Sequence, residues 1–248
     1  MSTQQPSPEV VKALSRYDSP TVCNVIELFD VRPRTAGYMN PSIKALFPEM
    51  PPMVGFATTA SFRSSWPAAP GELQVGFFAH LEALETLPQP RVVVFEDLDE
   101  PPAGATFGEV MCTVYRRLGC AGIITSGAAR DLDALRRLQF PTFASSVVVS
   151  HAYCRVEDVH QPVHVGGVTI RPGDLVHADT NGVVVVPAEI AERVALACPL
   201  YVEAERIVLD YAGRTDVTVG GIRKAYQGLR EQLGRIVAET AGKTEGLV

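Results

Sequence analysis

Three short and almost wholly apolar runs, separated by helical patterns, constrain the fold of this chain most strongly. The runs are Arg-Val-Val-Val-Phe-Glu at 91–96, Ala-Gly-Ile-Ile-Thr at 121–125 and Thr-Phe-Ala at 142–144. A strand that is apolar along its whole length is buried on both faces, as the strands of parallel sheets are. Residues 109–118 carry apolar side chains at helical spacing, and residues 132–138 form a second predicted helix. This alternation predicts a layered α/β fold with mixed strands.

The segments before these runs are predicted from the same signals. Residues 8–29 are expected to be helical, with Ser19-Pro20-Thr21 capping a second helix that buries Val22, Val25, Ile26 and Phe29. Residues 31–52 are rich in turn formers and are expected to form a loop with a short helix around 43–47. A strand at 53–62, a loop at 63–71 and a helix at 72–86 should follow.

The C-terminal part changes from a β-rich to a helical pattern. Residues 166–174 have the signature of a hairpin, and residues 175–179 and 182–187 are predicted to pair as strands. The last sixty residues are predicted to be mainly helical. Because no internal repeat and no long Gly/Ser linker divides the chain, we predict a single domain spanning residues 1–248, with a helical extension at 188–248.

The composition limits the classes of ligand and location. A chain of 248 residues with 46% hydrophobic content can bury a substantial core. Its net charge of -6 argues against a nucleic-acid surface, which needs clustered Lys and Arg. Five cysteines without a C-x-x-C pair fit reduced thiols, and neither a signal-peptide pattern nor a run of eighteen apolar residues occurs. We therefore expect a soluble cytoplasmic protein with no nucleic-acid and no membrane partner.

The most informative polar residues stand next to consecutive elements of the predicted sheet. Glu109 lies in the first turn of its predicted helix, and the adjacent pair Arg130 and Asp131 ends the loop after the next strand. Ligands bind at the carboxyl ends of strands in such sheets, and parallel pairing would bring both loops to one edge. Two carboxylates and a guanidinium at that edge could hold a hard cation beside an anionic substrate.

Each of these residues also has a structural interpretation. Glu109 could complement the dipole of its helix, Asp131 could be the N-cap of the helix that begins at Leu132, and Arg130 could be a solvated surface residue. The small residues at 127–129 favour the functional interpretation, because a loop without bulky side chains lets a ligand approach closely.

Other common site patterns do not occur in the sequence. His151, His160, His164 and His177 lack H-x-x-x-H spacing, which argues against a zinc cluster. Ser126 lacks the G-x-S-x-G frame of a hydrolase, and no G-x-G-x-x-G turn follows a strand. Hydrolase, dinucleotide-binding and methyl-donor functions therefore have no support.

Four motifs occur in order along the chain. They are Gly-Glu-Val-Met at 108–111, Ala-Gly-Ile-Ile-Thr-Ser-Gly-Ala-Ala-Arg-Asp at 121–131, Phe-Pro-Thr-Phe-Ala at 140–144 and the β-rich segment at 166–187. With them the chain resembles the RraA-like family, which includes the aldolases acting on 4-hydroxy-4-methyl-2-oxoglutarate and 4-carboxy-4-hydroxy-2-oxoadipate and the related regulators of ribonuclease activity. The resemblance covers about residues 19–187.

The resemblance implies a fold, an assembly and a set of site residues. The fold is the swivelling β/β/α fold, and the assembly is a homotrimer or homohexamer with active sites between subunits and a Mg²⁺ or Mn²⁺ ion. Asp131 is implied as the direct metal ligand, Arg130 as the residue that binds the substrate and its enolate, and Glu109 as the carboxylate that orders a metal-bound water. The amides of Gly108, Glu109, Val110 and Met111 are implied to bind the substrate carboxylate.

Two functions follow as hypotheses. The first is a divalent-metal-dependent lyase for small 2-oxo acids. It would cleave 4-hydroxy-2-oxo diacids such as 4-hydroxy-4-methyl-2-oxoglutarate by a class II retro-aldol reaction that releases pyruvate, or decarboxylate oxaloacetate, since both reactions need the same stabilised enolate. The second is a non-catalytic regulator that binds a protein partner such as a ribonuclease. It is favoured by Ser126, Asn24 and Thr180-Asn181, which stand where the family usually has acidic residues.

Overall fold

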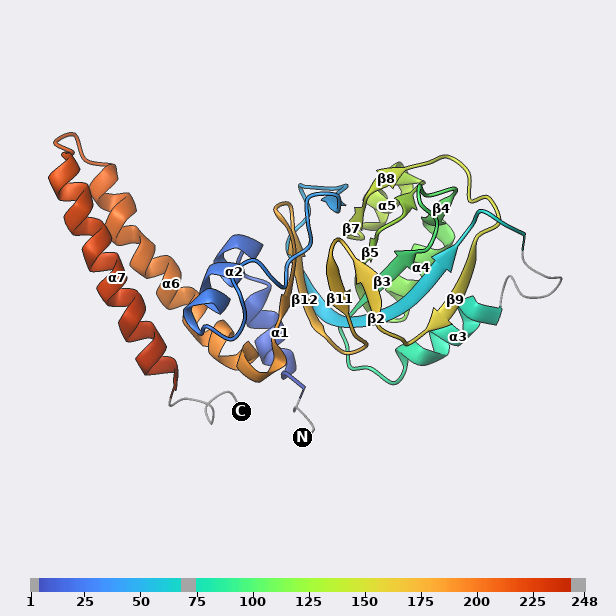
Figure 1. The fold of residues 1–248 in the computed structure, drawn as a ribbon, viewed down its shortest axis with the longest axis horizontal. Helices are drawn as coiled ribbons and strands as arrows, with labels where there is room; N and C mark the ends of the chain where they lie inside the picture. Colours follow the sequence, from blue (N-terminus) through green and yellow to red (C-terminus); the bar gives the residue numbers. More distant parts are fainter. Residues whose placement is uncertain (1–4, 68–74, 242–248) are drawn as a thin grey trace. The chain divides into compact units, whose positions relative to one another are not determined.

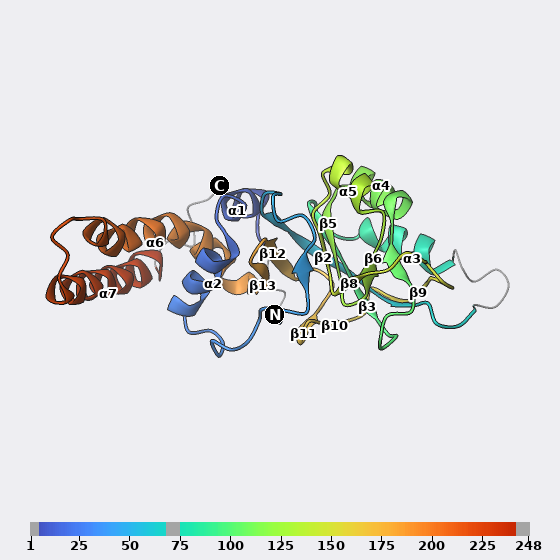
Figure 2. The ribbon, with the colours of Figure 1, turned by 90° about the horizontal axis from the view of Figure 1, so that it is seen from above.

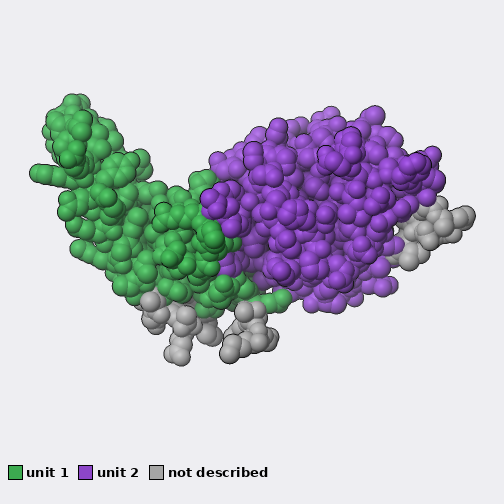
Figure 3. Space-filling view, viewed as in Figure 1, with its two compact units in different colours: residues 1–34, 188–248 green, residues 35–187 purple. Residues whose placement is uncertain are grey.

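The structure is a computed structural model that describes residues 5–67 and 75–241. The chain divides into two compact units (Figure 3), one formed by Thr35–Pro187 and the other by Met1–Arg34 together with Ala188–Val248. The division at residue 187 falls where the helical extension was predicted to begin. The prediction of a single domain spanning residues 1–248 stays a prediction.

An eight-stranded sheet forms the centre of the larger unit (Figure 1). Strands β2, β3, β5 and β7 run parallel to one another. Strand β1 pairs antiparallel with β7, both β12 and β9 pair antiparallel with β2, and β13 pairs antiparallel with β12. In sheet order the strands are β1 Lys44–Ala45, β7 Thr142–Ala144, β5 Cys120–Thr125, β3 Arg91–Asp97, β2 Met53–Arg63, β12 Leu175–Asp179 and β13 Gly182–Val186, with β9 Arg155–Val159 beside β2.

Alternate side chains of the central strands enter two separate hydrophobic cores. On β3, Val93 and Phe95 join one cluster, whereas Val92 and Val94 join the other, as the twofold period of a strand requires. Helices α3 (Val75–Leu84), α4 (Glu109–Arg117) and α5 (Leu132–Leu138) contribute to the first core. The hairpin of β10 (Val163–Val165) and β11 (Val168–Ile170) closes the second (Figure 2). Both faces of β3 are thus buried, which confirms the interpretation of its apolar run.

Along the chain, each strand of a second, smaller parallel sheet follows one of the main strands β3, β5 and β7. Its strands are β4 (Ala105–Phe107), β6 (Ala128–Ala129) and β8 (Ser146–Val147), in the order β4-β6-β8. None of the three was predicted, because two-residue and three-residue strands rich in alanine and serine carry almost no β signal.

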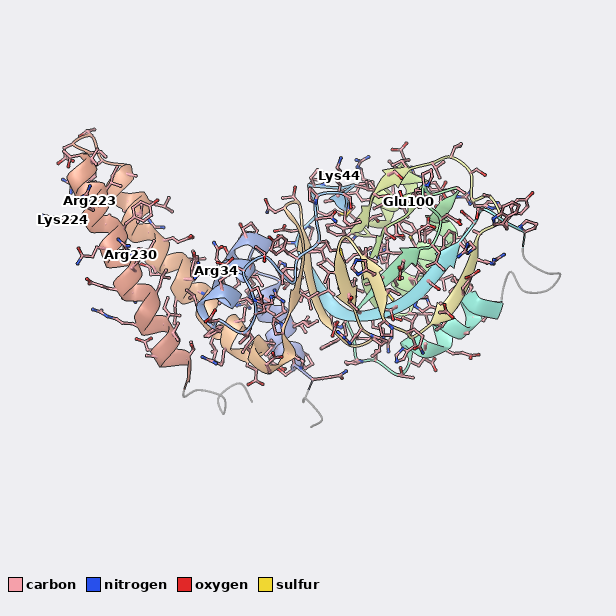
Figure 4. All side chains as sticks on the ribbon, viewed as in Figure 1. Arg34, Lys44, Glu100, Arg223, Lys224 and Arg230 are labelled. Atoms are coloured by element: carbon pink, nitrogen blue, oxygen red, sulfur yellow. The ribbon has the colours of Figure 1, made fainter. Side chains whose placement is uncertain are left out.

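The smaller unit is helical. Its elements are α1 (Pro8–Leu14), α2 (Ser19–Leu28), the 3-10 turn η1 (Ala188–Ile190), α6 (Ala191–Ala212) and α7 (Val219–Ala241). Helix α2 is capped by the carboxylate of Asp18, which accepts from the Thr21 amide at 2.9 Å, so the predicted cap at Ser19 is one residue late. Arg223, Lys224 and Arg230 project from α7 (Figure 4).

Most predicted elements are confirmed, and one is wrong. The mixed α/β class and the helical C-terminal region are as predicted, as are α4, α5 and the strand pair β12–β13. The short helix expected at 43–47 is instead β1, whose Lys44 pairs with Ala144. Of the helix expected at 72–86, α3 accounts for Val75–Leu84, and residues 72–74 lie outside the described residues. No helix within the described ranges is long and apolar enough to cross a bilayer.

The buried ring of His80 on α3 should make the folded state sensitive to acid. Its nitrogens lie 2.9 Å from Thr58 Oγ1 and 2.8 Å from the Tyr115 hydroxyl. Burial, and secondarily the neighbouring His160, lowers the pKa of His80 from 6.5 to about 4. Between those values the unfolded chain takes up a proton that the folded chain does not, so the free energy of unfolding should fall by up to ~3 kcal/mol as the pH decreases through this window.

Urea unfolding of the wild type and of His80→Gln at pH 7 and pH 4.5 measures this effect. The variant should be less stable than the wild type at pH 7 and should lose less stability on acidification. An equal loss in both proteins would show that His80 is not the responsible group.

Candidate active site

The small sheet brings the two predicted site loops together. Strands β4 and β6 are parallel, and Phe107 at the end of β4 pairs with Ala129 at the end of β6. The residues that follow, Gly108 after β4 and Arg130 after β6, therefore emerge at the same edge. The sequence-based expectation that parallel strands join these loops is correct, but the strands are β4 and β6 rather than β3 and β5.

Asp131 connects the two loops directly. Its backbone has a φ of 58°, in the left-handed region that few non-glycine residues adopt. Its Oδ2 atom accepts a hydrogen bond of 2.9 Å from the Glu109 amide, the first amide of α4. Asp131 occupies the N-cap position of α5, but its side chain makes no capping hydrogen bond there. The carboxylate instead lies at the N-terminus of α4, where the helix dipole favours a negative charge.

Arg130 is the second charged group of the site. Its Nε atom lies 3.8 Å from Asp131 Oδ2, and its side chain is 33% exposed. The same Nε atom is buried and makes no hydrogen bond within the described part of the chain. A buried donor without an acceptor costs free energy, so this N–H is available for an acceptor on a bound molecule. Arg130 is therefore not the solvated surface residue of the structural interpretation.

Gly108 is required by the close approach of these side chains. A Cβ atom at this position would collide with Asp131 Oδ2 and would stand 3.0 Å from Arg130 Nε. The φ of Gly108 is -151°, which any residue can adopt, so the constraint is steric and not conformational. The residue at the N-cap of α4 thus has to be glycine for the carboxylate of Asp131 to reach the helix.

The remaining predicted residues surround this contact. The Glu109 side chain is exposed, and only its amide contacts Asp131. The first intrahelical hydrogen bond of α4 runs from the Cys112 amide to the Gly108 carbonyl, so the amides of Val110 and Met111 have no carbonyl partner inside the helix. The predicted roles of the Glu109 carboxylate and of these amides stay predictions.

Cys112, on α4 beneath the site loops, is fully buried. Burial raises the pKa of its thiol, and the nearby Asp131 carboxylate raises it further. The thiol is therefore protonated at neutral pH, and a nucleophilic role for it has no basis.

The donor set fits a magnesium-like ion better than zinc. No group of three or more His, Cys, Asp or Glu residues is arranged to hold a metal anywhere in the described ranges. Mg²⁺ usually retains several waters and binds one or two carboxylates together with oxygen atoms of a substrate. Asp131, whose side chain is 41% exposed, can supply one such carboxylate next to the Arg130 Nε, which makes no hydrogen bond in the described residues.

One polar residue near the site was missed in the sequence. Asp97 ends β3, and its amide donates to Ser126 Oγ at 2.8 Å. Its Oδ1 accepts from the Asp99 amide at 3.0 Å, whereas its Oδ2 is buried and has no hydrogen-bond partner in the described part of the chain. Burial raises the pKa of Asp97 to about 6. Its position after an apolar run, in the acidic stretch Glu-Asp-Leu-Asp-Glu, resembles a solvated turn and gave no signal.

Comparison with known proteins gives the chain's relatives. The family model RraA-like, described as Aldolase/RraA, matches residues 21–185. A protein of Halalkalibacterium halodurans, provisionally named 4-hydroxy-4-methyl-2-oxoglutarate aldolase, is 35% identical over 91 residues, which are 36% of this chain and 43% of that protein. A protein of Ectopseudomonas mendocina with the same provisional name is 31% identical over 91 residues, or 35% and 54% of the two chains. This chain thus matches about half the length of these relatives.

Solved structures are similar over more of the chain. An uncharacterised protein from Pseudomonas syringae pv. tomato superposes with a TM-score of 0.72 at 21% identity, covering 92% of this chain and 97% of that one. This likeness concerns the fold alone. The RraAS2 protein of Streptomyces coelicolor, an unusual member of the RNase ES inhibitor RraA family, superposes with a TM-score of 0.66 at 26% identity, covering 82% of this chain and 96% of that one.

Proposed function

Because this chain belongs to the RraA-like family, described as Aldolase/RraA, we propose that it is a divalent-metal-dependent carbon–carbon lyase of small 2-oxo diacids. The observation that carries the proposal is the buried Nε of Arg130, which makes no hydrogen bond within the described residues, beside the half-exposed carboxylate of Asp131. The matched segment, residues 21–185, contains both residues together with Gly108 and Glu109.

Each residue of the site would have a separate role. Asp131 would hold Mg²⁺ or Mn²⁺, with Glu109 as an outer ligand acting through water. When bound, such an ion supplies Lewis-acid stabilisation of the negative charge that develops on the substrate. Arg130 would donate a hydrogen bond to the enolate oxygen on which this charge develops. The amides of Val110 and Met111 would bind the substrate carboxylate at the N-terminus of α4.

The substrate class follows from this arrangement of charges. A 2-oxo acid presents a carboxylate and a keto oxygen on adjacent carbons, and the site offers helix amides, a guanidinium and a metal-binding carboxylate side by side. Retro-aldol cleavage of a 4-hydroxy-2-oxo diacid and decarboxylation of oxaloacetate both leave the enolate of pyruvate. One site that stabilises this enolate would therefore catalyse both reactions.

A turnover screen tests the proposal. Purified protein is incubated with oxaloacetate and with 4-hydroxy-2-oxo diacids, in the presence of Mg²⁺ or Mn²⁺ or of excess chelator, and pyruvate release is followed. We expect release only with metal. Absence of release from every substrate with either metal would refute the lyase.

The alternative is a non-catalytic regulator that binds a protein such as a ribonuclease. It is supported by the similarity to RraAS2 and by Ser126, Asn24 and Asn181 at positions where acidic residues are usual. The double variant Arg130→Ala/Asp131→Ala separates the two functions. Ribonuclease inhibition that survives in the double variant would favour the regulator, whereas loss of pyruvate release with the fold intact would favour the lyase.

We also propose that the chain forms a homotrimer or homohexamer. The exposed apolar side chains of Val110, Val147 and Val149 belong to segments that adjoin the site, and they are 78%, 54% and 88% exposed. Apolar side chains with this exposure favour burial against a partner surface. Light scattering at micromolar concentration should give three or six times the chain mass, and a monomeric mass would contradict the proposal.

A further inference from the structure

Asp97 lies against the chain segment that leads to Arg130 and Asp131. A methyl group at Gly127 would collide with Asp97 Oδ2 and with Thr106 Oγ1, so the carboxylate packs directly on the Gly127 backbone. Gly127 begins the run that ends in Arg130-Asp131, and Thr106 lies on β4, two residues before Gly108. The carboxylate thus contacts the segment that leads to Arg130-Asp131, and Thr106, from the strand that leads to Gly108, approaches the same side of Gly127.

Two threonine side chains link the segment of Gly127 to β4. Thr125 Oγ1 accepts from the Gly127 amide at 2.9 Å and lies 3.1 Å from Thr106 Oγ1. The contact between Thr125 and Thr106 therefore joins the segment that leads to Arg130-Asp131 to the strand that precedes Gly108.

The surroundings of Asp97 make its negative charge costly. Burial raises the pKa of Asp97 to about 6, and Asp99 and Glu100 act in the same direction, while the Asp99 amide and Arg63 oppose them. Glu100 is on the segment that follows β3 (Figure 4). The contacts of Asp97 with the 126–127 segment come from uncharged serine and glycine. Ionisable groups that destabilise the folded state are concentrated at functional sites.

We propose that Asp97 is a positioning residue of the candidate site. Its carboxylate, seated against Gly127, holds the segment bearing Arg130-Asp131 in its working arrangement, and the contact between Thr125 and Thr106 couples that segment to the one bearing Gly108-Glu109. Its effect on turnover rests on the proposed function. Its effects on stability and on the order of residues 127–131 do not.

The variant Asp97→Asn tests this role, because it keeps the shape of the side chain and removes the charge. The folded pKa of Asp97 lies above the unfolded value of 3.8, so its contribution to stability is favourable at low pH and is lost as the pH rises through about 6. The variant should therefore melt about 2–4 °C above the wild type at pH 7.5 and show no such gain at pH 4.5. If the ionised carboxylate served only to stabilise the fold, Asp97→Asn would melt below the wild type at pH 7.5.

Two further readouts report on the site itself. The amides of residues 127–131 should exchange with deuterium faster in Asp97→Asn than in the wild type at pH 7.5. The variant should also lose about tenfold in kcat/KM, since small misplacements of catalytic groups are costly. The pH profile of kcat/KM should show an inflection near pH 6 in the wild type and none in the variant.

Asp174→Asn is the matched control. Asp174 is also half-buried, burial also raises its pKa, and its carboxylate accepts from the Arg171 amide in the turn before β12. This variant should leave exchange at 127–131 and the pH profile unchanged.

The proposal is overturned if Asp97→Asn is destabilised at pH 7.5, if exchange at residues 127–131 does not change, or if Asp174→Asn gives the same changes. If the wild type releases no pyruvate from any substrate, the proposed lyase activity is refuted. The melting temperature and the amide exchange at residues 127–131 then still decide the role of Asp97.

Discussion

Replacing Arg130 with alanine is expected to lower kcat/KM for cleavage of a 2-oxo diacid by about 10²–10³, the usual loss when one preorganised donor to a developing oxyanion is removed. The Nε of Arg130 is a buried donor that makes no hydrogen bond in the described part of the chain, so it is available to an acceptor on a bound molecule. The melting temperature should change little, because the ion pair of 3.8 Å between the guanidinium and Asp131 joins two partly exposed side chains. Steady-state kinetics with oxaloacetate and calorimetry measure both effects.

Arg130→Lys and Arg116→Ala are the controls for this variant. Lysine keeps the positive charge but lacks a planar guanidinium, so Arg130→Lys should recover only a small part of the activity. Arg116 is exposed in the last turn of α4, and its replacement should leave kcat/KM unchanged. Full activity in Arg130→Ala would remove the guanidinium from the mechanism.

Replacing Gly108 with alanine is expected to lower kcat/KM by about 10²-fold, because the added methyl group would displace Asp131 Oδ2 and Arg130 Nε together. The backbone at position 108 accepts an L-residue, so the chain should still fold. The hydrogen bond from the Glu109 amide to Asp131 should break, which amide hydrogen exchange at residue 109 would detect.

Gly234→Ala provides the comparison for Gly108→Ala. Gly234 lies within α7, where a Cβ atom would meet nothing within 4 Å, and alanine is the better helix former. It should be neutral for activity and slightly stabilising. Unchanged kcat/KM in Gly108→Ala would mean that the contact between Asp131 and α4 is not needed for turnover.

The larger elements of the fold were predictable because their patterns are strong. The apolar runs of β3 and β5 and the helical spacing of α4 each specify one local structure, and their alternation specifies an α/β arrangement. The small sheet was not predictable, since Ala128-Ala129 and Ser146-Val147 have no preference that identifies a strand. These strands form because the main sheet and the helices place them side by side, which is a tertiary effect.

The meeting of the two site loops was predicted, but its details were not. The sequence indicates that Arg130 and Asp131 should lie near the start of α4, and they do. It does not indicate that Asp131 adopts a positive φ or that its carboxylate caps α4 instead of α5, because both depend on the register of β4 against β6. Asp97 escaped detection for the same reason, since its carboxylate packs against Gly127, which lies between β5 and β6.

Binding of Mn²⁺, followed by electron paramagnetic resonance, tests most directly whether Asp131 and Arg130 form a metal-dependent site for 2-oxo acids. The wild type should bind one Mn²⁺ per chain, and pyruvate should tighten the binding. Asp131→Asn should lose this site, whereas Asp133→Asn, which changes a carboxylate on the first turn of α5 that is 89% exposed, should retain it. Equal Mn²⁺ binding by the wild type and Asp131→Asn would contradict the account.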